Sequence, residues 1–528
     1  MTITQEPGSR AQERRSPATA HAAVLIDILV CLALGACATS SDFHAPEVTA
    51  PAHWSDWHAG DTALALPVNE EEVTTPNSGW AAFKDPELTQ LIERARVANT
   101  DLRVTLLHLA QARITEGTVS AQHGVQVNAA LDAERRRDSA YGASTRVVNV
   151  IGGANPAPIL KALGEPYSLY RPGFDASWEL DLWGRLRRAE EAAHASVLEQ
   201  AATLRQARLS LVADVARAYF TLRSLQRQLQ LLQRELAARD DALQLMMARQ
   251  VGGLVDESAT IAAQQQRFAL RALRVSLQGQ EAHAMNQIAQ LLDAHPGALE
   301  GELALPPQPE PDFPLPQLQA GIPSDFARRR PDILAAEARL HEATANIGVA
   351  SADLYPRITL GATFGVESVG TGHLDEWAAR NWSLGPSMSL PVFDHGRRSA
   401  VVTLRKLQEQ EAALAYQQTV LKAWHEVDDA VTAYRAAVSE HAQLSEKAAL
   451  GERERWLTEI RANGGSTSSL PNLDAQISIL QIQRDLAVAR AQRNVALVAV
   501  FKALGDDGEV PHDSEDNANA TRERDTSR

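Results

Sequence analysis

The 528-residue sequence predicts a mainly α-helical protein whose chain also contributes a few strands to a membrane β-barrel and carries an internal duplication. Three observations support this fold class. Long stretches lack glycine and proline and repeat leucine with a coiled-coil period, short stretches alternate apolar and polar residues, and glycine landmarks recur at one offset. Only 5% of the residues are aromatic, which argues against an all-β or enzyme-like α/β body.

Composition also excludes several classes of function. The net charge is -15 and no Lys/Arg block stands apart from acidic neighbours, so we expect no nucleic-acid partner. No run of eighteen apolar residues suggests a transmembrane helix, so the chain would cross a membrane only as a barrel. The segment HWSDWH (53–58) lacks further ligands nearby, so we expect no metal and no cofactor. No catalytic Ser/His/Asp or Cys/His spacing appears, so we expect no enzyme.

The N-terminus reads as an export signal over residues 1–36. A basic segment precedes the apolar residues 22–36, and the small residues before Cys37 suit a cleavage site. The segment resembles a bacterial lipoprotein signal, which would make Cys37 the lipidated first residue of the mature chain. An ordinary signal cut nearby, with Cys37 uninvolved, is the alternative. Residues 37–80 would then form a periplasmic tail.

A very long helix is predicted from Arg185 to Gln250, where no glycine or proline intervenes. At about 1.5 Å per residue it would span on the order of 100 Å. Its apolar residues are spaced alternately four and three apart, which is the period of a coiled-coil seam. The seam residues are Leu211, Val215, Ala218, Leu222, Leu225, Leu229, Leu232 and Leu236. The helix is therefore expected to pack lengthwise on partners.

The unit that contains this helix is duplicated. SWELDLWGRLRR (177–188) returns as SMSLPVFDHGRRSA (387–400), which places Gly184 and Gly396 about 212 positions apart, and further Gly-Gly landmarks recur at that offset. The predicted parts are a first repeat over 81–294, a Pro-rich linker over 295–323, a second repeat over 324–505 and a disordered tail over 506–528.

Each repeat is expected to hold an opening helix, two strands, the very long helix, a Gly-Gly turn and a shorter return helix. Because the return helix cannot retrace the long one, we expect it to stack end to end with an opening helix. The first return helix would meet the second opening helix, which resumes from Ser324. The last return helix would meet the first opening helix, Glu87 to about Gln122.

Four segments of about ten residues alternate apolar with polar or small residues, as membrane strands do and as half-buried strands of a soluble sheet also do. Their apolar residues are Val125, Val127, Ala129, Leu131 and Ala133; Phe174, Ala176, Trp178, Leu180 and Leu182; Ile358, Leu360, Ala362, Phe364 and Val366; and Trp382, Leu384, Met388, Leu390 and Val392. Four strands cannot close a barrel, and open edges are costly in lipid. Three chains would supply twelve strands and twelve helical columns, which predicts a homotrimer.

Several segments resemble the TolC-like outer membrane factors, and among these the NodT-type efflux lipoproteins. They include FKDPELTQLI, FDASWELDLWGRLRR and GIPSDFARRRPDILAAEARLHEATANIGVASADLYPRITL. The resemblance implies a homotrimeric channel through the outer membrane and periplasm that docks on a periplasmic adaptor and an inner-membrane RND-type transporter and releases small toxic solutes. A type I secretion exit duct and a non-channel periplasmic coiled-coil scaffold lipoprotein are the alternatives.

The resemblance also implies functional positions. The helix tips that would contact the adaptor are Gly252, Gly253, Leu254, Gly464 and Gly465. Asp474 matches the second of two aspartates that narrow the closed periplasmic mouth in the family, while Pro471 stands in place of the first. Asp256 and Glu257 are further candidates for this gate. The alternatives are a plain tight turn at each tip and a first-turn helix acid at Asp474.

Overall fold

The structure is a computed structural model that describes residues 42–44, 46, 58–61, 64, 79–139, 142, 157–304, 329–466 and 468–505. The predicted signal sequence, Cys37 and the tail 506–528 lie outside these residues. The chain divides into two compact units, each of which gathers separate stretches of sequence. The sheet unit holds 1–44, 113–195 and 341–411, and the helical unit holds 45–112, 196–340 and 412–528.

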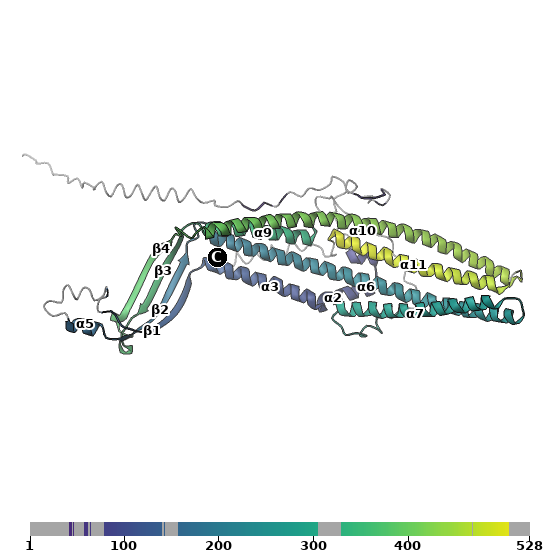
Figure 1. Cartoon of the computed structure of the whole chain (residues 1–528), viewed down its shortest axis with the longest axis horizontal. Coiled ribbons are helices and arrows are strands. Elements are labelled where there is room, and N and C mark those ends of the chain that lie inside the picture. The colour runs from purple at the N-terminus through teal and green to yellow at the C-terminus, as the bar shows by residue number, and fades with distance from the viewer. Residues whose placement is uncertain are drawn as a thin grey trace, which may run out of the picture. The chain divides into compact units, whose positions relative to one another are not determined.

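Within the described residues, the sheet unit contains one antiparallel sheet in the order β1-β2-β3-β4 (Figure 1). Its strands are β1 (Gln126–Arg136), β2 (Tyr167–Glu179), β3 (Arg357–Val366) and β4 (Arg380–Ser389). The register places Phe364 opposite Trp382 and Ala362 opposite both Ala176 and Leu384. Apolar residues therefore lie side by side on one face, where cross-strand pairs stabilise a sheet. A short helix, α5 (Ala157–Leu163), precedes β2.

The predicted strands are confirmed in position but not in every boundary. The segment after Pro356 is a strand over the expected residues. The second strand begins earlier than predicted, and Leu180 and Leu182 lie beyond its end. The reason is local, because both carboxylate oxygens of Asp181 accept backbone N–H groups at the start of the next helix, each at 3.0 Å. Because Asp181 caps the helix, the hydrogen-bonded pairing of β2 with its neighbouring strands ends before this residue. Leu390 and Val392 likewise lie beyond β4, and Val125 precedes β1.

The long helices occur as two similar pairs (Figure 1). They are α6 (Arg185–Val251) with α7 (Glu257–Leu291), and α10 (Arg397–Asn463) with α11 (Ser469–Leu504). Both α6 and α10 have 67 residues. Gly184 and Gly396, which precede them, have φ angles of 77° and 80°, a left-handed conformation that suits glycine. These matched lengths and turns agree with the predicted duplication.

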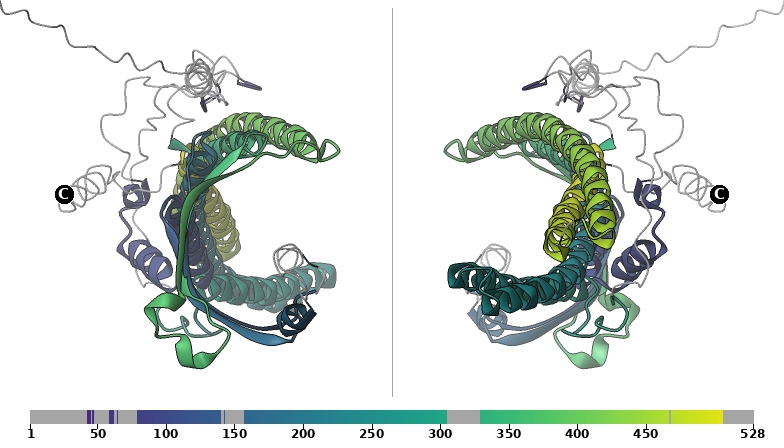
Figure 2. Two further views of the ribbon diagram at one scale, coloured as in Figure 1. Left: turned by 90° about the vertical axis from the view of Figure 1, so that its left-hand side faces the viewer. Right: turned by 90° about the vertical axis from the view of Figure 1, so that its right-hand side faces the viewer.

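Burial confirms the predicted seam of α6. Seven of its eight residues are buried in the main core and Leu229 packs partly buried against it. Viewed along the helices, the two long hairpins of the helical unit form a curved layer (Figure 2). The core also holds aromatic rings, with Phe83 4.8 Å from Phe220 and 6.1 Å from Phe501 between ring centroids. Among the helices described, none is both long and apolar enough to cross a membrane.

The predicted first opening helix is broken into α2 (Pro86–Ala98) and α3 (Thr100–Ser120). Asn99 lies at the break, where its side-chain oxygen accepts the backbone N–H of Leu102 at 2.9 Å and so begins a new helix. Its amide nitrogen donates to the carbonyl oxygen of Leu291 at 3.0 Å. The end of α7 therefore meets the start of α3, the opening helix of its own repeat.

The second return helix shows the same arrangement. α11 ends at Leu504, and the next residue, Gly505, caps it with a φ of 74°. The guanidinium of buried Arg330, just before α9 (Pro331–Ala352), donates to the carbonyl oxygen of Ala503 at 3.0 Å. The prediction that each return helix meets the opening helix of the other repeat is therefore wrong. α9 begins with Pro331 and has Asp332 in its first turn, whereas Ser324, where this helix was expected to resume, lies outside the described residues.

Candidate functional site

One face of the sheet exposes large apolar side chains to solvent in the single chain. Trp382 and Leu131 are each 76% exposed, which is unusual for residues of this size. The other exposed members are Val127, Phe174, Phe364, Leu384 and Met388. They come from all four strands. They share one face of the sheet because alternate residues of a strand point to the same side. The result is a continuous apolar surface that requires a partner or lipid.

The opposite face of the sheet is polar and hydrogen-bonded to itself. The hydroxyls of Thr359 and Ser387 lie 2.8 Å apart, and so do those of Thr363 and Ser383. Arg171 of β2 donates to Asp132 and Glu134 of β1 at 2.8 and 2.9 Å. A face of this chemistry tolerates water. The alternation predicted from the sequence therefore separates an apolar from a hydrated side.

The two helix tips are tight turns built on glycine. Gly253 and Gly465 have φ angles of 71° and 69°, and space around each would admit a Cβ atom, so only the backbone conformation demands glycine. The first turn is closed by the N–H of Leu254, which donates to the carbonyl of Arg249 at 2.9 Å. Leu254 is 79% exposed at this tip. Gly252 and Gly464 precede the left-handed residues, so the predicted tip residues do form the turns.

The structure places the gate candidates at the beginnings of the two return helices. Asp474 is exposed, but α11 begins at Ser469, so Asp474 lies in its second turn and the first turn has no acid. The alternative of a first-turn helix acid is therefore wrong. Pro471 is the third residue of α11, inside the first turn where proline is tolerated.

Asp256 is the N-cap of α7 and Glu257 its first residue. The Ser258 hydroxyl and the Glu257 N–H donate to Asp256 at 2.7 and 2.8 Å, and these bonds hold the pKa of Asp256 below its usual value. The assignment of Asp474, Asp256 and Glu257 to the gate stays a prediction.

Buried charge in the helical unit was missed by the sequence analysis. Glu235 of α6 is 1% exposed and accepts hydrogen bonds from Gln481 at 2.8 Å and Arg484 at 3.0 Å, both on α11. Arg330 pairs with Asp332 and with Glu426 of α10. No periodic signal marks Glu235, because it differs from other helix glutamates only in what packs against it.

His58, from the segment considered and rejected as a metal site, has a different role. Its Nδ1 lies 2.6 Å from a carboxylate oxygen of Asp428 on α10, and its side chain is 5% exposed. The hydrogen bond to Asp428 raises the pKa of His58 above the usual value. The contact holds a residue of the predicted N-terminal tail against the helical unit.

An antiparallel sheet with one exposed apolar face, together with long paired helices, is a fold that this chain shares with solved outer-membrane channels. Comparison with protein families matches residues 91–294 and 322–506 to the outer membrane efflux protein family, and the chain belongs to that family. It is similar to the outer membrane protein OprJ of Pseudomonas aeruginosa, with 32% identity over 90% of this chain and 94% of OprJ. It is also similar to the antibiotic efflux pump outer membrane protein ArpC of Pseudomonas putida, with 30% identity over 89% and 93% of the two chains.

Solved structures agree. The outer-membrane channel OprN superposes with a TM-score of 0.74 at 29% identity, covering 89% of this chain and 99% of that chain. The open-state MtrE outer membrane channel of Neisseria gonorrhoeae superposes with a TM-score of 0.70 at 26% identity, covering 89% and 98%. The protein is therefore the outer-membrane component of an efflux pump, and its location is the outer membrane.

Proposed function

We propose that the chain forms a passive trimeric duct in a tripartite efflux pump, together with a periplasmic adaptor and an inner-membrane RND-type transporter. The observation that carries this proposal is the two-sided sheet. Its exposed apolar face suits lipid, and its hydrogen-bonded polar face suits a water-filled passage. Such a duct moves solutes without chemistry, so we propose no catalytic activity.

The edges of the sheet support trimerisation. β1 has 11 residues and β4 has 10, and in the described residues neither has a partner on its outer side. An unpaired edge of this length is unfavourable in lipid, where each unsatisfied backbone group costs several kcal/mol. Pairing β4 of one chain with β1 of the next, three times around an axis, gives a closed twelve-stranded sheet.

The solutes are proposed to be small toxic molecules. Relatives are named for antibiotic efflux and for toluene efflux, both in Pseudomonas putida. These names favour efflux over type I secretion, and a coiled-coil scaffold would have no use for an apolar sheet face. The duct itself is expected to filter little, so the transporter would select the solute.

The helix tips are proposed to meet the adaptor, and Cys37 is proposed to carry lipid. Val251 is 92% exposed beside Leu254 at the first tip, which gives that turn an apolar end. Exposed apolar side chains at a helix turn suit a protein contact. Cys37 would add an acyl anchor to the attachment made by the sheet.

A matched pair of variants tests the duct. Leu384→Arg places a charge on the apolar face of β4, whereas Ser383→Arg places it on the polar face one residue earlier. Arginine on the lipid side costs about 2 to 4 kcal/mol at mid-membrane. We therefore expect Leu384→Arg to lose membrane insertion, and Ser383→Arg to insert and change single-channel conductance in planar bilayers.

Native mass spectrometry of the detergent-solubilised wild type should give a trimer. A monomer that conducts ions would refute the proposal that three chains are needed to close the sheet. Equal insertion of both arginine variants would refute the assignment of the two faces.

A further inference from the structure

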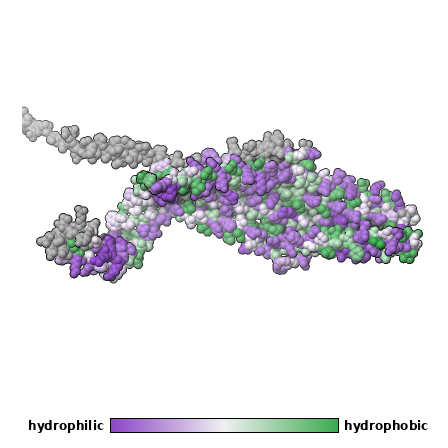
Figure 3. Space-filling view, in the orientation of Figure 1, coloured by the Kyte–Doolittle hydropathy of each residue, from purple (hydrophilic) through white to green (hydrophobic). Residues whose placement is uncertain are grey.

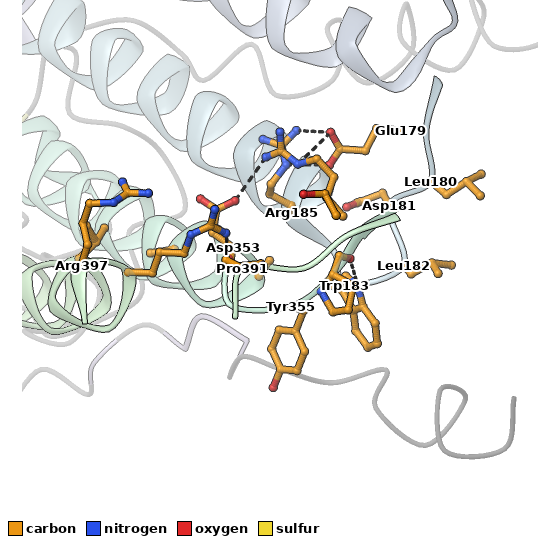
Figure 4. A pocket seen from close by; sticks show the side chains of 17 residues that line it. Glu179, Leu180, Asp181, Leu182, Trp183, Arg185, Asp353, Tyr355, Pro391 and Arg397 are labelled. Atoms are coloured by element: carbon orange, nitrogen blue, oxygen red, sulfur yellow. Dashed lines mark hydrogen bonds and ion pairs between the residues drawn. The ribbon is translucent and has the colours of Figure 1, made fainter. Parts of the chain in front are cut away.

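The two places where a strand leads into a long helix differ in charge, although they are equivalent in the repeat. Arg185 and Arg397 are the first residues of α6 and α10, 212 positions apart. Arg185 donates two hydrogen bonds to Glu179, at 2.8 and 2.9 Å (Figure 4). The position equivalent to Glu179 is Pro391. In the part of the chain that the structure describes, no ion pair joins the Arg397 side chain to a carboxylate, and no dashed line reaches it in Figure 4.

A second carboxylate is also replaced. The position equivalent to Asp181, which caps α6, is Phe393, and the cap of α10 is supplied instead by Asp394. Asp394 also pairs with Arg398 at 3.6 Å, so its charge is already engaged. In the single chain, Phe393 is 79% exposed and Val392 is 89% exposed. The second junction has therefore exchanged two acids for proline and phenylalanine.

These residues form one corner of the sheet unit, which we define as Leu390, Val392, Phe393 and Arg397. The apolar residues follow directly after β4, whose own apolar side chains are exposed. A hydrophobic patch is visible where β4 leads into α10 (Figure 3). Arg397 also lines a cavity of about 350 Å³, together with Pro391, Trp183 and Tyr355. Three carboxylates, those of Glu179, Asp181 and Asp353, line it as well, and each of them is paired with another arginine. Among the described residues, a guanidinium without a carboxylate partner therefore lies beside an exposed apolar surface and a cavity.

We propose that this corner binds an anionic phospholipid, with the phosphate on Arg397 and an acyl chain against Val392 and Phe393. The proposal rests on the proposed function, because the apolar sheet face must lie in lipid for the corner to reach headgroups. Charge complementarity favours an anionic headgroup, since arginine pairs with phosphate through a planar, bidentate donor set. The apolar members favour a lipid over free phosphate. The junction between β2 and α6 is not proposed as a second lipid site, because the Arg185 guanidinium there is already paired with Glu179.

The test measures retention of phosphatidylglycerol, relative to phosphatidylcholine, by the detergent-solubilised full chain in native mass spectrometry. Wild type should retain phosphatidylglycerol preferentially, and an excess of glycerol phosphate should not displace it. Arg397→Ala should weaken retention about fivefold, the factor expected when one arginine near an anionic lipid surface is removed. Pro391→Glu should weaken it equally while keeping Arg397, because the new carboxylate would hold the guanidinium as Glu179 holds Arg185. Phe393→Ser should weaken retention of both lipids.

Arg453→Ala is the matched control, since Arg453 is an exposed arginine much further along the same helix. It should retain phosphatidylglycerol as wild type does. Equal retention by wild type, Arg397→Ala and Pro391→Glu would overturn the proposal, and so would displacement by glycerol phosphate. Conductance recorded on the same preparations separates the two hypotheses. A conducting protein without lipid preference would overturn only this inference, whereas a non-conducting wild type would overturn the proposed function.

Discussion

The guanidinium of Arg484 on α11 donates to the carboxylate of Glu235 on α6 at 3.0 Å, and Glu235 is almost fully buried. Removal of one member of a buried ion pair leaves the other charge without compensation in the low-dielectric interior of the protein. We expect Arg484→Ala, which leaves the buried Glu235 carboxylate without its cationic partner, to lower the free energy of unfolding by about 3 to 5 kcal/mol. Loss of helical circular dichroism on heating or in denaturant measures the change.

Asp214→Ala provides the control for that experiment. Asp214 pairs with Arg217 at 2.6 Å on the same helix, but the pair is exposed, so its loss should change stability by less than about 1 kcal/mol. Equal destabilisation by the two variants would show that burial of Glu235 is not what makes its ion pair important.

Lipidation of Cys37 is predicted from the residues that precede it. Cys37→Ser should abolish acylation and impair processing, while the sheet should still allow insertion into the membrane. Mass spectrometry of the mature N-terminus measures both. An unmodified wild-type chain that begins at another residue would contradict the prediction.

Asp474 is predicted to act at the periplasmic mouth. In a trimer three copies would lie around one axis, where their charges attract cations and repel anions. Asp474→Ala should therefore lower cation selectivity and lessen block by multivalent cations. Because Asp474 lies in the second turn of α11, beyond the reach of the helix dipole, helix stability should change by less than about 0.3 kcal/mol. Single-channel recordings at two salt concentrations check this, and identical selectivity in both proteins would rule out the gate.

The first helix tip is predicted to bind the adaptor through its apolar end. Leu254→Asp should leave the trimer intact but raise drug susceptibility in a host that lacks its own outer-membrane efflux component and supplies an adaptor and transporter. Gly253→Ala is the comparison, because an alanine at its φ of 71° should cost about 1 to 2 kcal/mol in the turn without adding charge. Unchanged resistance with Leu254→Asp would mean that the tip is only a turn.

The contact between His58 and Asp428 predicts a pH dependence. Since folding raises the pKa of His58, its stabilising contribution is complete below the unfolded value of about 6.5 and is lost as pH rises through the folded value. Burial and Arg435 oppose this shift but do not reverse it. Protection of residues 58–61 from amide hydrogen exchange should therefore fall above neutral pH. Asp428→Asn should remove that dependence, and a wild-type profile that is flat with pH would contradict it.

Much of the fold could be predicted because its helices and strands follow from the spacing of apolar residues that are near one another in the sequence. The spacing of Leu211 to Leu236 required a long packed helix, alternation after Pro356 required a two-sided strand, and the recurring glycines marked both tips. These patterns depend only on helix and strand geometry, so they can be recognised without knowing which residues pack against them. The candidate tip residues were predictable for the same reason.

The sequence by itself determined the helices, the strands, the duplication and the apolar face of the sheet. Only the tertiary structure decided which helix ends meet, where Asn99 and Asp181 redirect the chain, and which charges are buried. The physical reason is that an end-to-end junction, such as Arg330 with Ala503, is made by hydrogen bonds between residues far apart in sequence. Such bonds leave no period in the sequence. The same holds for the difference between Arg185, which pairs with Glu179, and Arg397, which has no carboxylate partner among the described residues.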